Sequence, residues 1–75
     1  MNKKRRKAIS VVSQKLSSIR DELGTIQDEE TFSRENIPEN LQSSEVYENS
    51  EETSDYIENA INNIEAAIDD LNSIQ

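Results

Sequence analysis

Acidic and basic side chains supply nearly all the chemistry open to this 75-residue sequence, because it contains neither Cys nor His. Its many serines therefore lack a base that could activate them as nucleophiles. The three adjacent carboxylates at residues 28–30 would point in different directions on a helix, and they lack the D-x-D-x-D-G spacing of a calcium loop. We expect no enzymatic activity, no metal and no cofactor, which leaves binding or a structural role as the function.

Charge is sorted along the chain. Residues 1–20 contain seven basic groups and no acid, whereas residues 35–75 contain eleven acids and no base. The basic segment could contact the phosphate of a nucleotide, a lipid or a nucleic acid, or it could be a solubilising segment paired with acids. The net charge of −8 opposes direct binding to nucleic acid. The candidate anion contacts are Lys3, Lys4, Arg5, Arg6, Lys7, Arg20 and Arg34.

Two stretches show the apolar periodicity of helices. In residues 9–26 apolar side chains recur at alternating spacings of three and four, the a/d pattern of a coiled coil. In residues 57–74 the heptads I-E-N-A-I-N-N and I-E-A-A-I-D-D fill positions a, d and e, a wider face that suits a multi-helix bundle. Gly24, inside the first stripe, is either simply tolerated or marks a close helix approach or a mild bend. The expected core is Ile9, Val12, Leu16, Ile19, Leu23, Ile26, Ile57, Ala60, Ile61, Ile64, Ala67, Ile68, Leu71 and Ile74.

The segment between the two stripes predicts a connection. Pro38 disfavours helical backbone at the residue before it. Asn36, followed three residues later by Glu39, resembles a capping box, and Ser43 and Ser44 are further candidate N-caps. The sequence thus predicts a single unit over 1–75, with a helix over about 3–31, a connection over about 33–43 and a helix over about 44–74, in which residues 49–54 are expected to fray.

Two long helices joined by a short connection predict an all-α, antiparallel, coiled-coil-like hairpin. Folding back is expected to place the basic segment beside Glu65, Asp69 and Asp70, where exposed ion pairs select the topology more than they add stability. One hairpin cannot cover its own apolar stripe. We therefore expect self-association, with a homodimeric four-helix bundle favoured.

The opposite end of the hairpin, at the connection, is expected to be strongly acidic. Its carboxylates could imitate a nucleic-acid backbone and occupy the groove of a host enzyme, or they could form an ordinary solvated surface. The aromatic residues Phe32, Tyr47 and Tyr56 are expected to pack near this end, with partner binding as the alternative. The candidate partner contacts are Asp28, Glu29, Glu30, Glu35, Glu39, Glu45 and Glu48.

The stretches D-E-E-T-F at residues 28–32 and I-P-E-N-L-Q-S-S-E at residues 37–45 resemble a signature of small proteins from phages and prophages. Those proteins share a basic N-terminus and a C-terminal run of I-E-x-A-I heptads, so the resemblance covers nearly the whole chain. It implies a phage origin but supplies no catalytic or binding residues. With neither a secretory signal nor a membrane-spanning stretch in the sequence, the expected location is the cytoplasm of the host bacterium.

These features together predict a non-enzymatic accessory protein that binds and modulates or inhibits a host macromolecule through its acidic helical surface. The expected partners are a second copy of the chain and a host protein, with no membrane. Two alternatives stay open. The chain could sequester an anionic nucleotide signal in a basic pocket shared between subunits, or it could be a passive coiled-coil element of an assembly.

Overall fold

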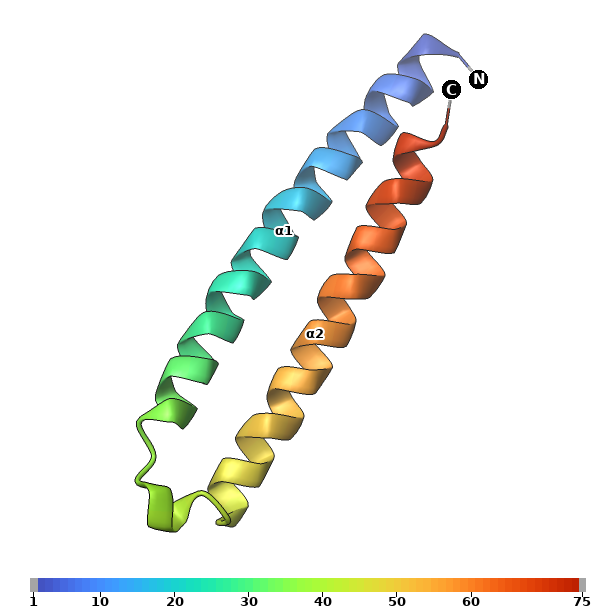
Figure 1. Cartoon of the computed structure of the whole chain (residues 1–75). Helices are drawn as coiled ribbons and strands as arrows, with labels where there is room; N and C mark the ends of the chain where they lie inside the picture. The colour runs from blue at the N-terminus through green and yellow to red at the C-terminus, as the bar shows by residue number, and fades with distance from the viewer. Residues whose placement is uncertain (1, 75) are drawn as a thin grey trace.

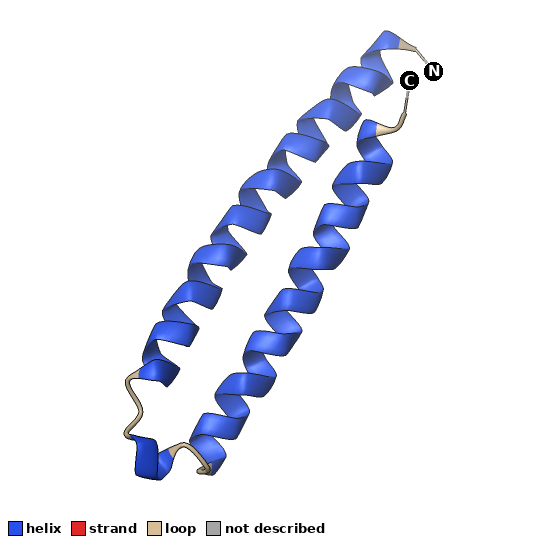
Figure 2. Cartoon of the chain, in the orientation of Figure 1, coloured by secondary structure: helices blue, strands red, loops and turns tan. Residues whose placement is uncertain are grey.

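The computed structural model describes residues 2–74 and consists of two long helices that run antiparallel (Figure 1). Helix α1 spans Lys3–Glu35, the single 3-10 turn η1 spans Glu39–Leu41, and helix α2 spans Glu45–Asn72. The hairpin is a rod with extents of 60 × 14 × 12 Å, and its termini lie together at the end opposite the connection (Figure 1, Figure 2). The predicted all-α antiparallel hairpin is confirmed.

Both long helices begin at a side-chain cap. The Asn2 side chain accepts a hydrogen bond from the backbone N–H of Arg5 at 2.8 Å, and the Ser44 hydroxyl accepts one from the backbone N–H of Tyr47 at 3.3 Å. Of the two candidate N-caps, Ser44 is therefore confirmed, and Ser43 lies in the connection before it. The first turn of α2 carries acids, which the helix dipole favours, whereas the first turn of α1 carries none. The start of α1 thus depends on its cap.

Helix α1 extends beyond its predicted end at residue 31. Asn36 closes it, because the backbone N–H and the side-chain amide of Asn36 both donate to the carbonyl of Phe32. The predicted capping box at Asn36 is wrong, since this residue ends one helix instead of starting another. Pro38 explains the stop, because the residue before a proline avoids helical backbone. Helix α2 ends two residues before its predicted end, and its polar stretch 49–54 is helical.

Hydrogen bonds between the helices show their register. The Ser13 hydroxyl donates to the side chain of Asn72 at 3.1 Å, and the Gln27 amide donates to the carbonyl of Ser54 at 3.5 Å. Nearer the loop, the Arg34 guanidinium donates to the Ser54 hydroxyl at 2.7 Å and to a second serine, Ser50. We call these residues the polar seam: Ser13, Gln27, Arg34, Ser50, Ser54 and Asn72.

This register corrects the predicted position of the basic segment, residues 3–7, which we call the basic arm. Since Ser13 lies level with Asn72, the arm begins about 9 Å and ends about 15 Å beyond that level, past the last turn of α2. The first turns of α1 project accordingly in Figure 1. Asp69 and Asp70 lie on the inner side of Asn72, and Glu65 lies deeper still. The described residues form no ion pair between the arm and these acids.

The seam between the helices is more polar than the predicted core. The least exposed residues are Ser13, Ser50, Ser54 and Ile68, each with 7–8% of its surface exposed. Every buried side-chain nitrogen or oxygen within residues 2–74 has a hydrogen-bond partner, which makes this burial tolerable. Of the predicted core residues only Ile68 is buried within one chain. Along α1 the buried or half-buried residues include a row at spacings of four and three: Ser13, Ser17, Arg20, Gly24, Gln27, Thr31 and Arg34. Of these, Ser13, Gln27 and Arg34 hydrogen-bond to α2, whereas a Cβ at Gly24 would meet nothing within 4 Å, so Gly24 marks no close approach within the chain.

Candidate functional site

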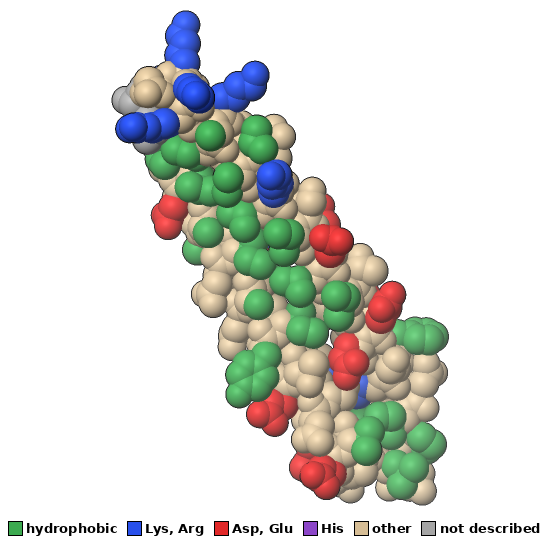
Figure 3. Space-filling view, turned by 180° about the vertical axis from the view of Figure 1, so that it is seen from behind, with side chains coloured by type: hydrophobic (Ala, Val, Ile, Leu, Met, Phe, Trp, Pro, Cys, Tyr) green, Lys and Arg blue, Asp and Glu red, His purple; other side chains and the backbone are tan. Residues whose placement is uncertain are grey.

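One long face of the hairpin is apolar and uncovered, as Figure 3 shows from the basic end toward the loop. Val12, Ile19 and Ile26 retain 44–50% of their surface exposed, and Ile74 retains 40%. Helical spacing puts the open side of the α1 stripe and the d positions of α2 on this same side. The apolar face comprises Ile9, Val12, Leu16, Ile19, Leu23 and Ile26 of α1 and Ile57, Ala60, Ile64, Ala67, Leu71 and Ile74 of α2.

The position of this face follows from the polar seam. The row of small and polar residues on α1 packs toward α2, so Val12, Ile19 and Ile26 of the stripe beside it are turned outward, while Ile9, Leu16 and Leu23 are half-buried. On α2 the isoleucine Ile68 is buried between the helices, whereas Ile61 is half-buried, like the a-position residues Ile57, Ile64 and Leu71. The apolar stripes alone do not predict this seam. Its signal is the spacing of four and three that begins at Ser13, which runs parallel to the apolar stripe.

All the carboxylates proposed as partner contacts lie toward the loop end, and we call them the acidic tip. Six are exposed and Glu30 is half-buried. The base nearest to them in sequence, Arg34, has its guanidinium hydrogen-bonded to the serines of α2. Within residues 2–74 none of these acids takes part in an ion pair, so their charge is uncompensated. The tip consists of Asp28, Glu29, Glu30 and Glu35 of α1, Glu39 of η1, and Glu45 and Glu48 of α2.

The aromatic residues near the tip differ from one another in exposure. Phe32 and Tyr56 each keep 67% of their surface exposed, whereas Tyr47 is half-buried. The prediction that all three pack within the hairpin is therefore wrong for Phe32 and Tyr56. A shallow groove between the helices lies at this same end, lined by Glu30, Ser33, Arg34, Ile37, Val46, Asn49, Ser50 and Thr53.

The predicted anion contacts do not converge within one chain. Arg20 lies in the middle of α1 and pairs with Asp21 at 3.3 Å, while Arg34 is held near the loop by serines. At 1.5 Å per residue, Arg20 is about 20 Å along the helix from Lys7, and Arg34 is about 20 Å further on. A pocket that joined these groups would need side chains from other subunits.

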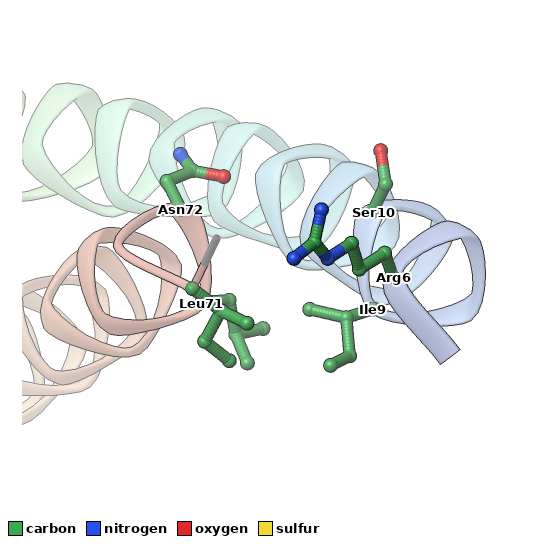
Figure 4. Close-up of a pocket in the computed structure, with 6 residues that line it drawn as sticks. Arg6, Ile9, Ser10, Leu71 and Asn72 are labelled. Atoms are coloured by element: carbon green, nitrogen blue, oxygen red, sulfur yellow. The ribbon is translucent and has the colours of Figure 1, made fainter. Parts of the chain in front are cut away.

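A second shallow crevice lies at the basic end, where the two helices finish (Figure 4). Arg6, Ile9 and Ser10 line it from α1, and Leu71 and Asn72 line it from α2, together with Ile74. Arg6 is the one charged side chain in this lining. Within one chain the crevice therefore offers a single cation, not the several converging cations of a basic pocket.

The described part of the chain has neither a metal site nor a membrane span. Between residues 2 and 74, no three acidic side chains lie close enough together to hold a metal ion. Neither of the long helices described above is apolar enough to cross a membrane.

No known protein family, no curated protein and no solved structure matches this chain. The protein is therefore classified by its structure alone. It is a two-helix hairpin with a hydrogen-bonded polar seam, an uncovered apolar face and an acidic loop end. Its candidate functional sites are two surfaces, the apolar face and the acidic tip.

Proposed function

We propose that this chain is a non-enzymatic accessory protein of phage type, which self-associates through its apolar face and binds a host macromolecule through its acidic tip. One observation carries the proposal. The acids of the tip gather at one end of the rod without ion pairs among residues 2–74, and Arg34 is occupied by Ser50 and Ser54. A cationic surface on a partner would neutralise this charge.

Self-association is supported by the exposure of the apolar face. Large aliphatic side chains that are roughly half exposed follow one another along most of the rod, whereas monomeric proteins seldom expose a contiguous apolar patch of this length. Two hairpins packed face to face would bury both patches in a four-helix bundle. A homodimer is the smallest assembly that does so.

The charge density of the tip suggests what it binds. Duplex DNA carries one negative charge per about 1.7 Å, so a protein that imitates it needs closely spaced carboxylates on a stiff support. The tip spans the last turns of α1 and the first turn of α2, both of which are helical. We infer a nucleic-acid-handling protein of the host as the partner, with its cationic groove as the binding site and the bacterial cytoplasm as the location.

The experiment compares three forms of the tagged protein in affinity capture from host lysate. The first is the native chain. The second is a tip variant that combines Glu35→Gln, Glu39→Gln, Glu45→Gln and Glu48→Gln. The third is a control of equal net charge in which the four changes lie on the rest of α2, namely Glu58→Gln, Glu65→Gln, Asp69→Asn and Asp70→Asn.

The expected result is capture of one nucleic-acid-handling protein by the native chain and by the control, and loss of that protein with the tip variant. The purified complex should weaken steeply between about 50 and about 200 mM salt and should compete with duplex DNA. If the tip variant captures the same protein as well as the native chain does, the acidic tip is not the binding surface.

A further inference from the structure

We propose that a second copy of this chain covers the apolar face in an antiparallel arrangement, with the two loops at opposite ends and Arg5 of each copy beside Glu30 of the other. This inference rests on the self-association proposed above and specifies its geometry. It follows from the symmetry of the apolar stripes, from the register of the helices, and from the positions of charge at the two ends of α1.

The apolar stripe of α1 is symmetric about its own midpoint, which lies between residues 17 and 18. An antiparallel contact between two copies of α1, related by a twofold axis at this midpoint, would place each position of the stripe against its reversed counterpart. Every such pair is apolar. The pairs are Ile9 with Ile26, Val12 with Leu23, and Leu16 with Ile19.

The stripe of α2 has its midpoint between residues 65 and 66. The twofold axis that relates the two α1 stripes also passes level with this midpoint. Counting inward from the bond between Ser13 and Asn72 places the α1 midpoint level with residues 67–68 of α2. Counting from the bond between Gln27 and Ser54 places it level with residues 63–64. The α2 midpoint lies between these two values. One axis therefore aligns both stripes with themselves.

Opposite charges bracket the α1 stripe on the same side of the helix. Arg5 precedes Ile9 by four residues, and Glu30 follows Ile26 by four residues. The separation of Arg5 and Glu30 is close to seven whole turns, so the two side chains share one side of α1. In the antiparallel arrangement Arg5 of each copy meets Glu30 of the other, and the whole basic arm lies level with residues 28–32 of the other copy. The arm thus neutralises residues 28–30 of the acidic tip, and the acids nearer the loop, Glu35, Glu39, Glu45 and Glu48, are left for the host partner.

The alternative arrangement, with both loops at one end, is electrostatically unfavourable. It would put the two basic arms side by side. Because the arm forms no ion pair within its own chain among residues 2–74, the charges of both arms would then repel each other without compensation. It would also put the two acidic tips together, and like charges that face each other at an interface disfavour that arrangement. The projection of the arm past α2 suits the antiparallel arrangement, since it extends the arm over the other copy.

A spin-label distance tests the orientation. The native chain has no Cys, so Asn40→Cys in η1 gives one exposed label per copy, to be measured by pulsed electron paramagnetic resonance. The antiparallel arrangement predicts a separation of about 60 Å between the labels, since each loop lies about 30 Å from the axis at 1.5 Å per residue. Helices in adjacent hairpins are about 10 Å apart, so loops at one end would give less than about 25 Å.

Charge reversal tests the specific pair. Arg5→Glu or Glu30→Arg alone should weaken dimerisation about three- to tenfold, and the double variant should return it to within about twofold of the native value. Both changes suit the dipole of α1, so a weaker dimer would not reflect an unfolded helix. The matched controls are Lys4→Glu and Glu29→Arg, which make the same charge changes away from the apolar face and should have smaller effects.

The possible outcomes distinguish the antiparallel arrangement from self-association itself. A dimer with labels about 60 Å apart, in which the double charge reversal restores affinity, supports the antiparallel arrangement. A dimer with a short label distance overturns that arrangement and leaves self-association standing. A native chain that stays monomeric in sedimentation equilibrium overturns both self-association and the arrangement built on it.

Discussion

Replacing Ile19 with Gln tests the apolar face directly, because Ile19 lies beside the midpoint of the α1 stripe and keeps 44% of its surface exposed. Gln has a slightly higher helix propensity than Ile, so the substitution leaves the helix itself intact. What it removes is the apolar surface that a second copy would cover. The quantity that should change is therefore the dissociation constant of the dimer, with little change in helix content.

The expected size of the effect follows from the exposed fraction. Full burial of an Ile side chain stabilises by about 1.5–3 kcal/mol, so covering the exposed 44% contributes about 1 kcal/mol. A symmetric dimer contains this side chain twice, which gives about 2 kcal/mol for the assembly. At 1.4 kcal/mol per factor of ten, Ile19→Gln should raise the dissociation constant about 30-fold.

Sedimentation equilibrium over a range of concentrations measures this constant, with circular dichroism as a check on helix content. Val46→Gln is the matched control, since Val46 is 71% exposed but lies at the loop end, outside the apolar face. It should change the constant less than about twofold. An unchanged constant for Ile19→Gln, or an equal loss for both variants, would refute the assignment of this face as the self-association surface.

Two further predictions concern the hairpin itself. Gly24→Ala should raise the free energy of unfolding by about 1 kcal/mol, because Ala favours the helix more than Gly does and the added Cβ meets nothing within 4 Å. Thermal circular dichroism should show a Tm increase of about 4–8 °C, and a decrease in Tm would contradict the prediction. Arg34→Met should lower the unfolding free energy by about 1–3 kcal/mol in urea denaturation, because it leaves Ser50 and Ser54 without their donor. The control is Arg20→Met, which removes a half-buried guanidinium that hydrogen-bonds to Asp21 of the same helix and, among the described residues, to no residue of α2. An equal loss there would argue against the contribution of the Arg34 hydrogen bonds.

The all-α hairpin was predictable because its signals are local. Two periodic stripes, a proline between them and the cap at Ser44 lead to the observed helices without reference to any distant contact. The exact ends were harder to predict. Asn36 resembles the start of a helix in sequence, yet the carbonyl of Phe32 needs a donor where α1 stops, and Asn36 supplies it.

The amino-acid sequence by itself determined which residues are apolar, how they repeat and how charge divides between the halves of the chain. Only the tertiary structure decided which side of each helix faces the other. That choice depends on hydrogen bonds across long sequence separations, above all those of Ser13 with Asn72 and of Arg34 with Ser54. These bonds satisfy polar groups between the helices, and they thereby turn the apolar stripes outward and carry the basic arm past the end of α2.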